Sequence, residues 1–172
     1  RERKIVFLTD LHNNSYGKNN EKLLGAVKCQ KPDLILVGGD MLVGKSDIST
    51  KIAEEFVKKL TAICPVYYAN GNHEQRMKIY PDKFGTTYQE YKVSVEQSGV
   101  QFLENEHIDL MFDSCPIQIH GLEIPREGYK KFRKTNVSLE QIEERIGKAD
   151  SSKYQILLAH NPIYADTYLE WG

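Results

Sequence analysis

In the stretch Leu34-Ile35-Leu36-Val37-Gly38-Gly39-Asp40, four apolar residues are followed by two glycines and an aspartate. Its four consecutive apolar residues predict a strand that is buried on both faces, as in a parallel sheet. The two glycines that follow allow a tight turn and leave room beside the backbone. In open α/β sheets the ligand crevice lies just outside the carboxyl ends of the strands. We therefore expect Asp40 to lie at a functional site.

The composition is that of an ordinary globular protein, and it argues against several classes of function. The chain has 172 residues, 40% hydrophobic and 27% charged, which is enough for one domain with a sizeable core. Its formal net charge of −1 gives no electrostatic case for nucleic acid or acidic lipid as the main partner. The three cysteines are far apart, so neither a disulfide framework nor a thiolate zinc site is predicted.

Three further apolar stretches end in polar residues in the same way, and helical patterns separate them. Buried strands are predicted over residues 5–8, 65–69 and 154–159, and helices over residues 21–30 and about 47–62. Ser46 or Asp47 is expected to cap the second of these helices. Strands that alternate with helices favour parallel pairing and right-handed crossovers.

The second half of the chain is less regular. Residues 86–97 predict a helix, 100–103 a short strand, and 107–112 with 116–124 an antiparallel hairpin. His107 and His120 of that hairpin are expected to be surface residues. Residues 125–136 predict a basic connector rather than a substrate-binding loop, and Ser138 with Gln141 predicts a capping box. Without repeats or linkers, residues 1–172 are predicted to form one α/β (α+β) domain with a mixed sheet.

Side chains that commonly bind metals follow four separate predicted strands. They are Asp10 with His12, Asp40, Asn72 with His73, and His160. Carboxylate, amide and imidazole donors suit manganese, iron, zinc or similar divalent ions. Two such ions about 3.5–4 Å apart can share a carboxylate, clamp a phosphoryl group and ionise a water. Each motif alone is weak, because Asp-x-His is common in loops, Gly-Gly-Asp and Asn-Gly also mark turns, and a histidine after a strand is more often structural than a ligand. The order of all four therefore carries the prediction.

Asp10-Leu11-His12, Gly39-Asp40, Gly71-Asn72-His73-Glu74 and His160 resemble the first four signature blocks of the calcineurin-like metallophosphoesterases. The chain is similar in particular to the bacterial branch whose members often carry an N-terminal membrane anchor. The resemblance implies a sandwich of two mixed β-sheets flanked by helices. It also implies hydrolysis of a small-molecule or lipid-linked phosphomonoester or phosphodiester.

The resemblance further implies a role for each matching residue. Asp10 and His12 would hold a first metal, Asn72 and His160 a second, and Asp40 would bridge both. His73 would contact the phosphate and help to protonate the leaving oxygen, while a hydroxide between the metals attacks. Glu74 would support the ligands from behind, or would serve only as a negative charge at a helix N-terminus.

The family's fifth block, Gly-His-x-His, is not found before Gly172. The last strands of the fold are therefore expected to lie outside this chain, so that the domain is incomplete at its C-terminus. The alternative hypothesis is a metal-poor, inactive piece or a binding module. A serine hydrolase that uses His73 or His160 is not favoured, because no G-x-S-x-G motif is present. The expected location is cytoplasmic, or membrane-anchored through a segment outside this chain.

Overall fold

The computed structural model describes residues 2–129 and 136–172. The strands are β1 (Ile5–Leu8), β2 (Leu34–Val37), β3 (Val66–Tyr68), β4 (Gln101–Phe102), β5 (Glu106–Phe112), β6 (Cys115–Leu122) and β7 (Tyr154–Ala159). The helices are α1 (Glu21–Gln30), α2 (Lys51–Leu60), α3 (Asn72–Ile79), α4 (Pro81–Phe84), α5 (Thr87–Glu96), α6 (Leu139–Ile146) and α7 (Ala165–Trp171). Short 3-10 turns lie at Lys18–Asn20, Arg126–Tyr129 and Pro162–Tyr164.

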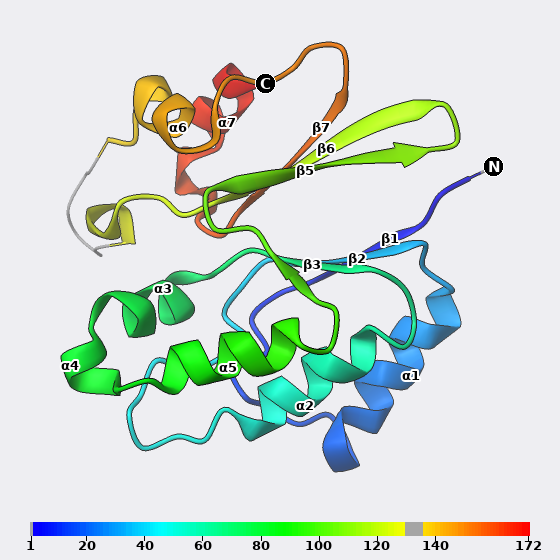
Figure 1. Ribbon diagram of the computed structural model, residues 1–172, viewed down its shortest axis with the longest axis vertical. Coiled ribbons are helices and arrows are strands. Elements are labelled where there is room, and N and C mark those ends of the chain that lie inside the picture. Colours follow the sequence, from blue (N-terminus) through cyan, green and yellow to red (C-terminus); the bar gives the residue numbers. More distant parts are fainter. Residues whose placement is uncertain (1, 130–135) are drawn as a thin grey trace.

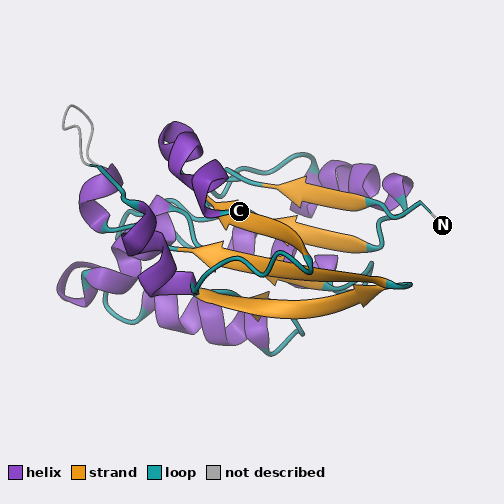
Figure 2. Cartoon of the chain, turned by 90° about the horizontal axis from the view of Figure 1, so that it is seen from above, coloured by secondary structure: helices purple, strands orange, loops and turns teal. Residues whose placement is uncertain are grey.

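These elements stack in four layers (Figure 1). Helices α1, α2 and α5 cover one face of the sheet β1–β4, whose other face packs against the sheet β5–β7, and α6 and α7 cover the far side. Seen from above, the strands of both sheets run along one general direction (Figure 2), as in aligned sheet packing. The two stacked sheets between helical layers are thus confirmed.

The first sheet has the order β1-β2-β3-β4 and is parallel throughout. All four residues of β2 are buried, as predicted. The prediction of a buried strand is wrong for β1, where Phe7 is 56% exposed. The reason is that β1 forms the edge of the sheet, and the described core between the sheets begins at Leu34 and Leu36 of β2.

The second sheet is mixed, because β6 pairs antiparallel with β5 and parallel with β7. Its inner face contributes Ile117, Ile119 and Leu158 to the core between the sheets. The prediction that His120 is a surface residue is wrong, since His120 is 1% exposed. The face that carries it is covered by α7, whose Trp171 ring lies 4.8 Å from the imidazole, measured between ring centroids. His107, its neighbour across the hairpin, is exposed as expected.

The starts of α6 and α2 test the two helix caps that the sequence predicts. The capping box at α6 is confirmed, because Ser138 and Gln141 exchange hydrogen bonds. The cap predicted for α2 is wrong: the helix begins at Lys51, after Thr50, and no side chain caps it. Of the predicted basic connector, residues 130–135 lie outside the described residues.

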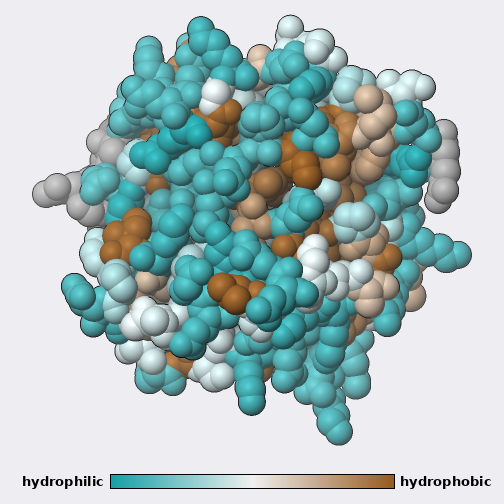
Figure 3. All heavy atoms as spheres, in the orientation of Figure 1, coloured by the Kyte–Doolittle hydropathy of each residue, from teal (hydrophilic) through white to brown (hydrophobic). Residues whose placement is uncertain are grey.

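The visible face in Figure 3 is largely hydrophilic, with separate hydrophobic patches. Phe7, Met111, Ile163 and Leu169 are among the large apolar side chains that are exposed. Across residues 2–129 and 136–172, no helix has the length and apolar character needed to cross a membrane.

Candidate metal centre

Five of the six predicted site residues meet around Asp40. Asp10, Asp40 and His160 form one group of side chains that could hold an ion, and His12, Asp40 and His73 form another. Within each group the ligand atoms lie within 4.8 Å of one another. Asp40, which is 3% exposed, belongs to both groups. Residues that are up to 150 positions apart in sequence therefore share one carboxylate.

The loops after β1 and β2 run side by side beyond the ends of their strands. The backbone N–H of Asp10 donates to the carbonyl of Gly39, and that of His12 donates to the carbonyl of Asp40, both at 3.0 Å. This path places Asp10, His12 and Asp40 in the left-handed region, with φ of 59°, 49° and 52°. Such a backbone costs a non-glycine residue on the order of 1–3 kcal/mol, and it is typical of functional sites.

Two glycines allow the loops after β2 and β3 to touch. A Cβ atom on Gly39 would lie 2.0 Å from the backbone nitrogen of Gly71, and one on Gly71 would lie 2.2 Å from Oδ1 of Asp40. Gly39 also has a φ of 89°, which disfavours any side chain. The room that the sequence predicts beside Gly39 is thus occupied by the neighbouring backbone.

Glu74 holds these loops together from behind. It is 0% exposed, and its Oε2 accepts from the backbone N–H groups of Asp40 (2.8 Å) and Gly71 (3.1 Å). Its Oε1 accepts from the N–H of Leu42 at 3.0 Å and from the hydroxyl of Tyr68 at 2.9 Å. Burial and the charge of Asp40 raise the pKa of Glu74. The bond from Gly71 is a capping contact at the start of α3, and the bonds from Asp40 and Leu42 hold the loop after β2, so the structure is compatible with both implied roles of Glu74.

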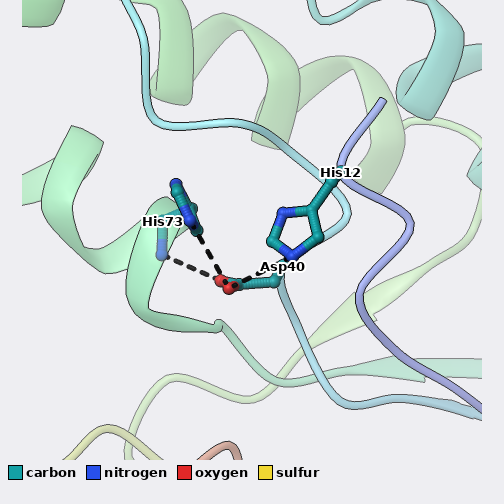
Figure 4. Close-up of side chains that lie close together, drawn as sticks. All are labelled: His12, Asp40 and His73. Carbon is teal, nitrogen blue, oxygen red and sulfur yellow. Dashed lines mark hydrogen bonds and ion pairs between the residues drawn. The ribbon is translucent and has the colours of Figure 1, made fainter. Parts of the chain in front are cut away.

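Three imidazoles face the same oxygen of Asp40, and Figure 4 shows two of them, His12 and His73. Oδ2 of Asp40 lies 3.2 Å from Nε2 of His160, 3.8 Å from that of His73 and 3.9 Å from that of His12. Ligand atoms about 2.0–2.2 Å from a shared ion lie roughly 3–3.5 Å apart. The donor set and its spacing therefore fit a divalent metal, with small adjustments on binding.

His160 presents its Nε2 atom to Asp40. Its Nδ1 donates to the carbonyl of Gly38 at 2.8 Å, so Nε2 is the atom that faces the carboxylate. Burial lowers the pKa of His160, but the hydrogen bond to Asp40 and the charge of Asp40 outweigh burial and raise it to about 9. The pair thus attracts a cation, and a proton on Nε2 occupies the position that a metal would take.

The ring nitrogens of His73 have the opposite roles to those of His160. The backbone N–H of Gly44 donates to its Nδ1 at 2.7 Å, and a ring nitrogen that accepts a hydrogen bond carries no proton. The ring proton therefore lies on Nε2, which points toward Asp40 at 3.8 Å. Burial lowers the pKa of His73, which favours this neutral form. His73 offers the centre an N–H donor, whereas His160 offers it a lone pair once the proton on its Nε2 is lost.

The remaining predicted ligands are Asp10, His12 and Asn72. Oδ2 of Asp10 accepts from the hydroxyl of Thr9 at 2.7 Å, and its Oδ1 lies 3.3 Å from Nε2 of His12. Asn72 is the first residue of α3 and is half-buried. Within the described parts of the chain its amide makes no side-chain hydrogen bond. The roles of Gly44 and Thr9 were not predicted, because a backbone amide and a lone hydroxyl leave no signal in the sequence.

The chain belongs to the calcineurin-like phosphoesterase family, whose model matches residues 3–172. This confirms the resemblance and identifies a family of metal-dependent phosphoesterases, which are hydrolases. The uncharacterized metallophosphoesterase YkoQ of Bacillus subtilis (strain 168) is 27% identical over 92% of this chain and 53% of its own length. The probable glycerophosphodiester phosphodiesterase GpdQ of Arcobacter nitrofigilis is 26% identical over 77% of this chain and 43% of its own length.

The chain spans about half the length of these relatives. Among solved structures, the phosphopantetheinyl hydrolase PptH from Mycobacterium tuberculosis aligns with a TM-score of 0.48 and 17% sequence identity. That alignment covers 98% of this chain and 60% of the other.

Proposed function

We propose that the full-length protein is a two-metal phosphoesterase that hydrolyses a phosphomonoester or phosphodiester with water. The observation that carries the proposal is the single carboxylate, Asp40, shared by two groups of donors. The division of ligands follows the family resemblance and cuts across the two geometric groups: Asp10 and His12 would hold one ion, Asn72 and His160 would hold the other, and Asp40 would bridge them. When bound, two manganese, iron or zinc ions would supply the charge that activates a water and stabilises the phosphoryl oxygens.

The protein's own contribution to the chemistry centres on His73. With its proton on Nε2, a neutral His73 donates a hydrogen bond to a phosphoryl oxygen and toward the leaving oxygen. Donors aimed at developing negative charge act strongly in a partly buried site, and loss of one typically costs about 10²–10³-fold in kcat. Asp10 and Asp40, both oriented by neighbouring hydrogen bonds, keep the centre negative enough to retain cations.

A paired substitution tests the two histidine roles. In the full-length protein loaded with Mn²⁺, we expect His73→Asn to lower kcat by about 10²–10³-fold while the metal content is unchanged. We expect His160→Asn to lose the second ion and activity together. Metal content by elemental analysis and hydrolysis of 4-nitrophenyl phosphate and bis(4-nitrophenyl) phosphate provide the measurements.

The same experiment distinguishes the proposed enzyme from the alternative, a metal-poor binding module. Two ions per chain and cleavage of either ester support the proposal. Absence of both ions and of both activities from the unaltered full-length protein would falsify it. Because the relative GpdQ is named a probable glycerophosphodiester phosphodiesterase, glycerophosphodiesters are the first biological diesters to assay.

A further inference from the structure

A second polar cluster lies behind the candidate metal centre, around the end of β3. Asn70 is 1% exposed and stands two residues before Asn72. Its Nδ2 lies 2.7 Å from the hydroxyl of Tyr88, 2.7 Å from Oε1 of Glu104 and 2.8 Å from Oε1 of Glu123. These acceptors come from α5, from the segment after β4 and from the segment after β6. Its two N–H groups are shared among the three acceptors, and one amide therefore joins three parts of the fold.

The charges in this cluster are paired. Nζ of Lys78 lies 3.1 Å from Oε1 of Glu104 and 2.8 Å from Oε2 of Glu123, and Lys92 also pairs with Glu104. Burial would raise the pKa of Glu104, but hydrogen bonds from Lys92 and Tyr88 outweigh burial and lower it to about 2. Two carboxylates are thus held against two ammonium groups, in an arrangement that resists displacement of any one member.

The strand register shows why this cluster matters for the metal centre. Leu122 of β6 pairs with Ala159 of β7, so Glu123 and His160 each follow the same rung of the second sheet. Asn70 and Asn72 belong to the end of β3 in the first sheet. The hydrogen bond between Asn70 and Glu123 therefore ties together the two strand ends that carry Asn72 and His160.

Directional contacts at this end of the sheets are few and lie close together. Within residues 2–129 and 136–172 the sheets share no strand pairing, and the core between them is apolar. Besides the bond from Asn70, α3 reaches the segment after β6 through Lys78, which pairs with Glu123. It also does so through Nε2 of Gln75, which donates to the carbonyl of Ile124 at 2.8 Å. Apolar contacts are non-directional, so they hold two layers together without setting a register between them. The bond from His160 to Gly38 links the ends of β7 and β2, and the bond from Asn70 to Glu123 links the ends of β3 and β6.

We propose that Asn70 and Glu123 are positioning residues whose hydrogen bond sets the separation between the Asn72–His73 loop and His160. The inference rests on the proposed two-metal function. Neither residue belongs to a donor group of the candidate metal centre. Residues that orient ligands from behind typically change metal affinity or activity about 10–100-fold when they are removed, and we expect that range for loss of this bond.

The test uses the full-length protein and Co²⁺, whose visible absorption reports the geometry of its ligands. We expect Asn70→Ala and Glu123→Ala to weaken binding of the second Co²⁺ by about 10–100-fold and to change the absorption of the bound ions. Glu123→Gln keeps an acceptor oxygen, and we expect it to restore the affinity to within about threefold. Glu123→Ala removes the same hydrogen bond by removing its acceptor. If Asn70→Ala does not fold, Glu123→Ala can still be compared with the unaltered protein.

Lys92→Gln is the matched control, because it removes a charge from the same cluster without touching the bond from Asn70 to Glu123. We expect it to lower the midpoint of thermal unfolding while leaving the Co²⁺ spectrum unchanged. If Asn70→Ala and Glu123→Ala behave like this control, the cluster is only structural and the inference is wrong. If the unaltered protein binds no pair of Co²⁺ ions, the proposed function itself fails and the inference fails with it.

Discussion

The two sheets differ in the length of their strands, and two histidines of the second sheet lie in very different surroundings. Strands of the first sheet are two to four residues long, and β1 and β2 end in left-handed loops that press against one another. The second sheet has longer strands, and it buries His120 in the middle of β6 while His160 follows the end of β7. His160 faces a carboxylate, whereas His120 lies between two glutamines and Trp171. Position relative to the end of a strand, and not residue type, separates the two histidines.

The largest expected effect is at the residue that both donor groups share. We expect Asp40→Asn to lower both metal content and hydrolysis by more than about 100-fold, because the bridging negative charge is lost. Elemental analysis and initial rates on the full-length protein provide the measurement. Asp82→Asn, an exposed aspartate on α4, is the control and should behave like the unaltered protein. Retention of both ions by Asp40→Asn would contradict the shared site.

The difference between His160 and His120 should appear in the pH dependence of metal binding, because the pKa of His160 is raised to about 9. A metal must displace the proton on Nε2, so apparent metal affinity should fall about tenfold for each pH unit below 9. Titration calorimetry between pH 6 and 8 in buffers of different ionisation enthalpy would detect the released proton. A metal affinity that does not change over this range would argue against His160 as a ligand.

The metal-free protein should show the opposite trend with pH. The pKa of His160 is higher in the folded chain, at about 9, than its unfolded value of about 6.5. The Asp40–His160 pair therefore stabilises the fold fully below about pH 6.5, and this contribution is lost as pH rises toward 9. Urea unfolding of the metal-free protein measures the difference, and His160→Gln should remove it.

A smaller effect, on stability, is expected at Glu74, which holds the loops after β2 and β3. We expect Glu74→Gln to lower the free energy of unfolding by about 1–3 kcal/mol, because an amide nitrogen cannot accept the N–H groups that the carboxylate accepts now. Glu55→Gln, on the exposed face of α2, should change it by less than about 0.5 kcal/mol. Equal stabilities of the two variants in urea titrations would show that Glu74 does not hold the loops.

The smallest effect on the metal centre is expected from His120, the buried histidine of β6. Burial lowers the pKa of His120, so it is neutral and serves packing against Trp171. We expect His120→Gln to leave metal content and kcat/KM within about twofold, at a cost of roughly 1 kcal/mol in stability. A loss of activity comparable to that of His160→Asn would remove the distinction between the two histidines.

Local sequence signals predicted much of the fold where they act over a few residues. The capping box at Ser138, the hairpin around residues 113–115 and the buried strand at Leu34 are all found. Predictions that depend on what covers a face were less reliable. Phe7 is exposed because its strand is at an edge, and His120 is buried because α7 packs over it. A strand carries no record of its neighbours, so its pattern alone cannot decide either outcome.

What the sequence determined by itself was the chemistry of the site: carboxylates, an amide and imidazoles placed directly after apolar strands, in an order that defines the family. Tertiary structure alone decided how each imidazole is used. The carbonyl of Gly38 accepts the Nδ1–H of His160 and so turns Nε2 toward Asp40, and the amide of Gly44 leaves the ring proton of His73 on Nε2. These backbone groups exist at every residue, so only the fold, by bringing one carbonyl and one amide to the right rings, assigns the two roles.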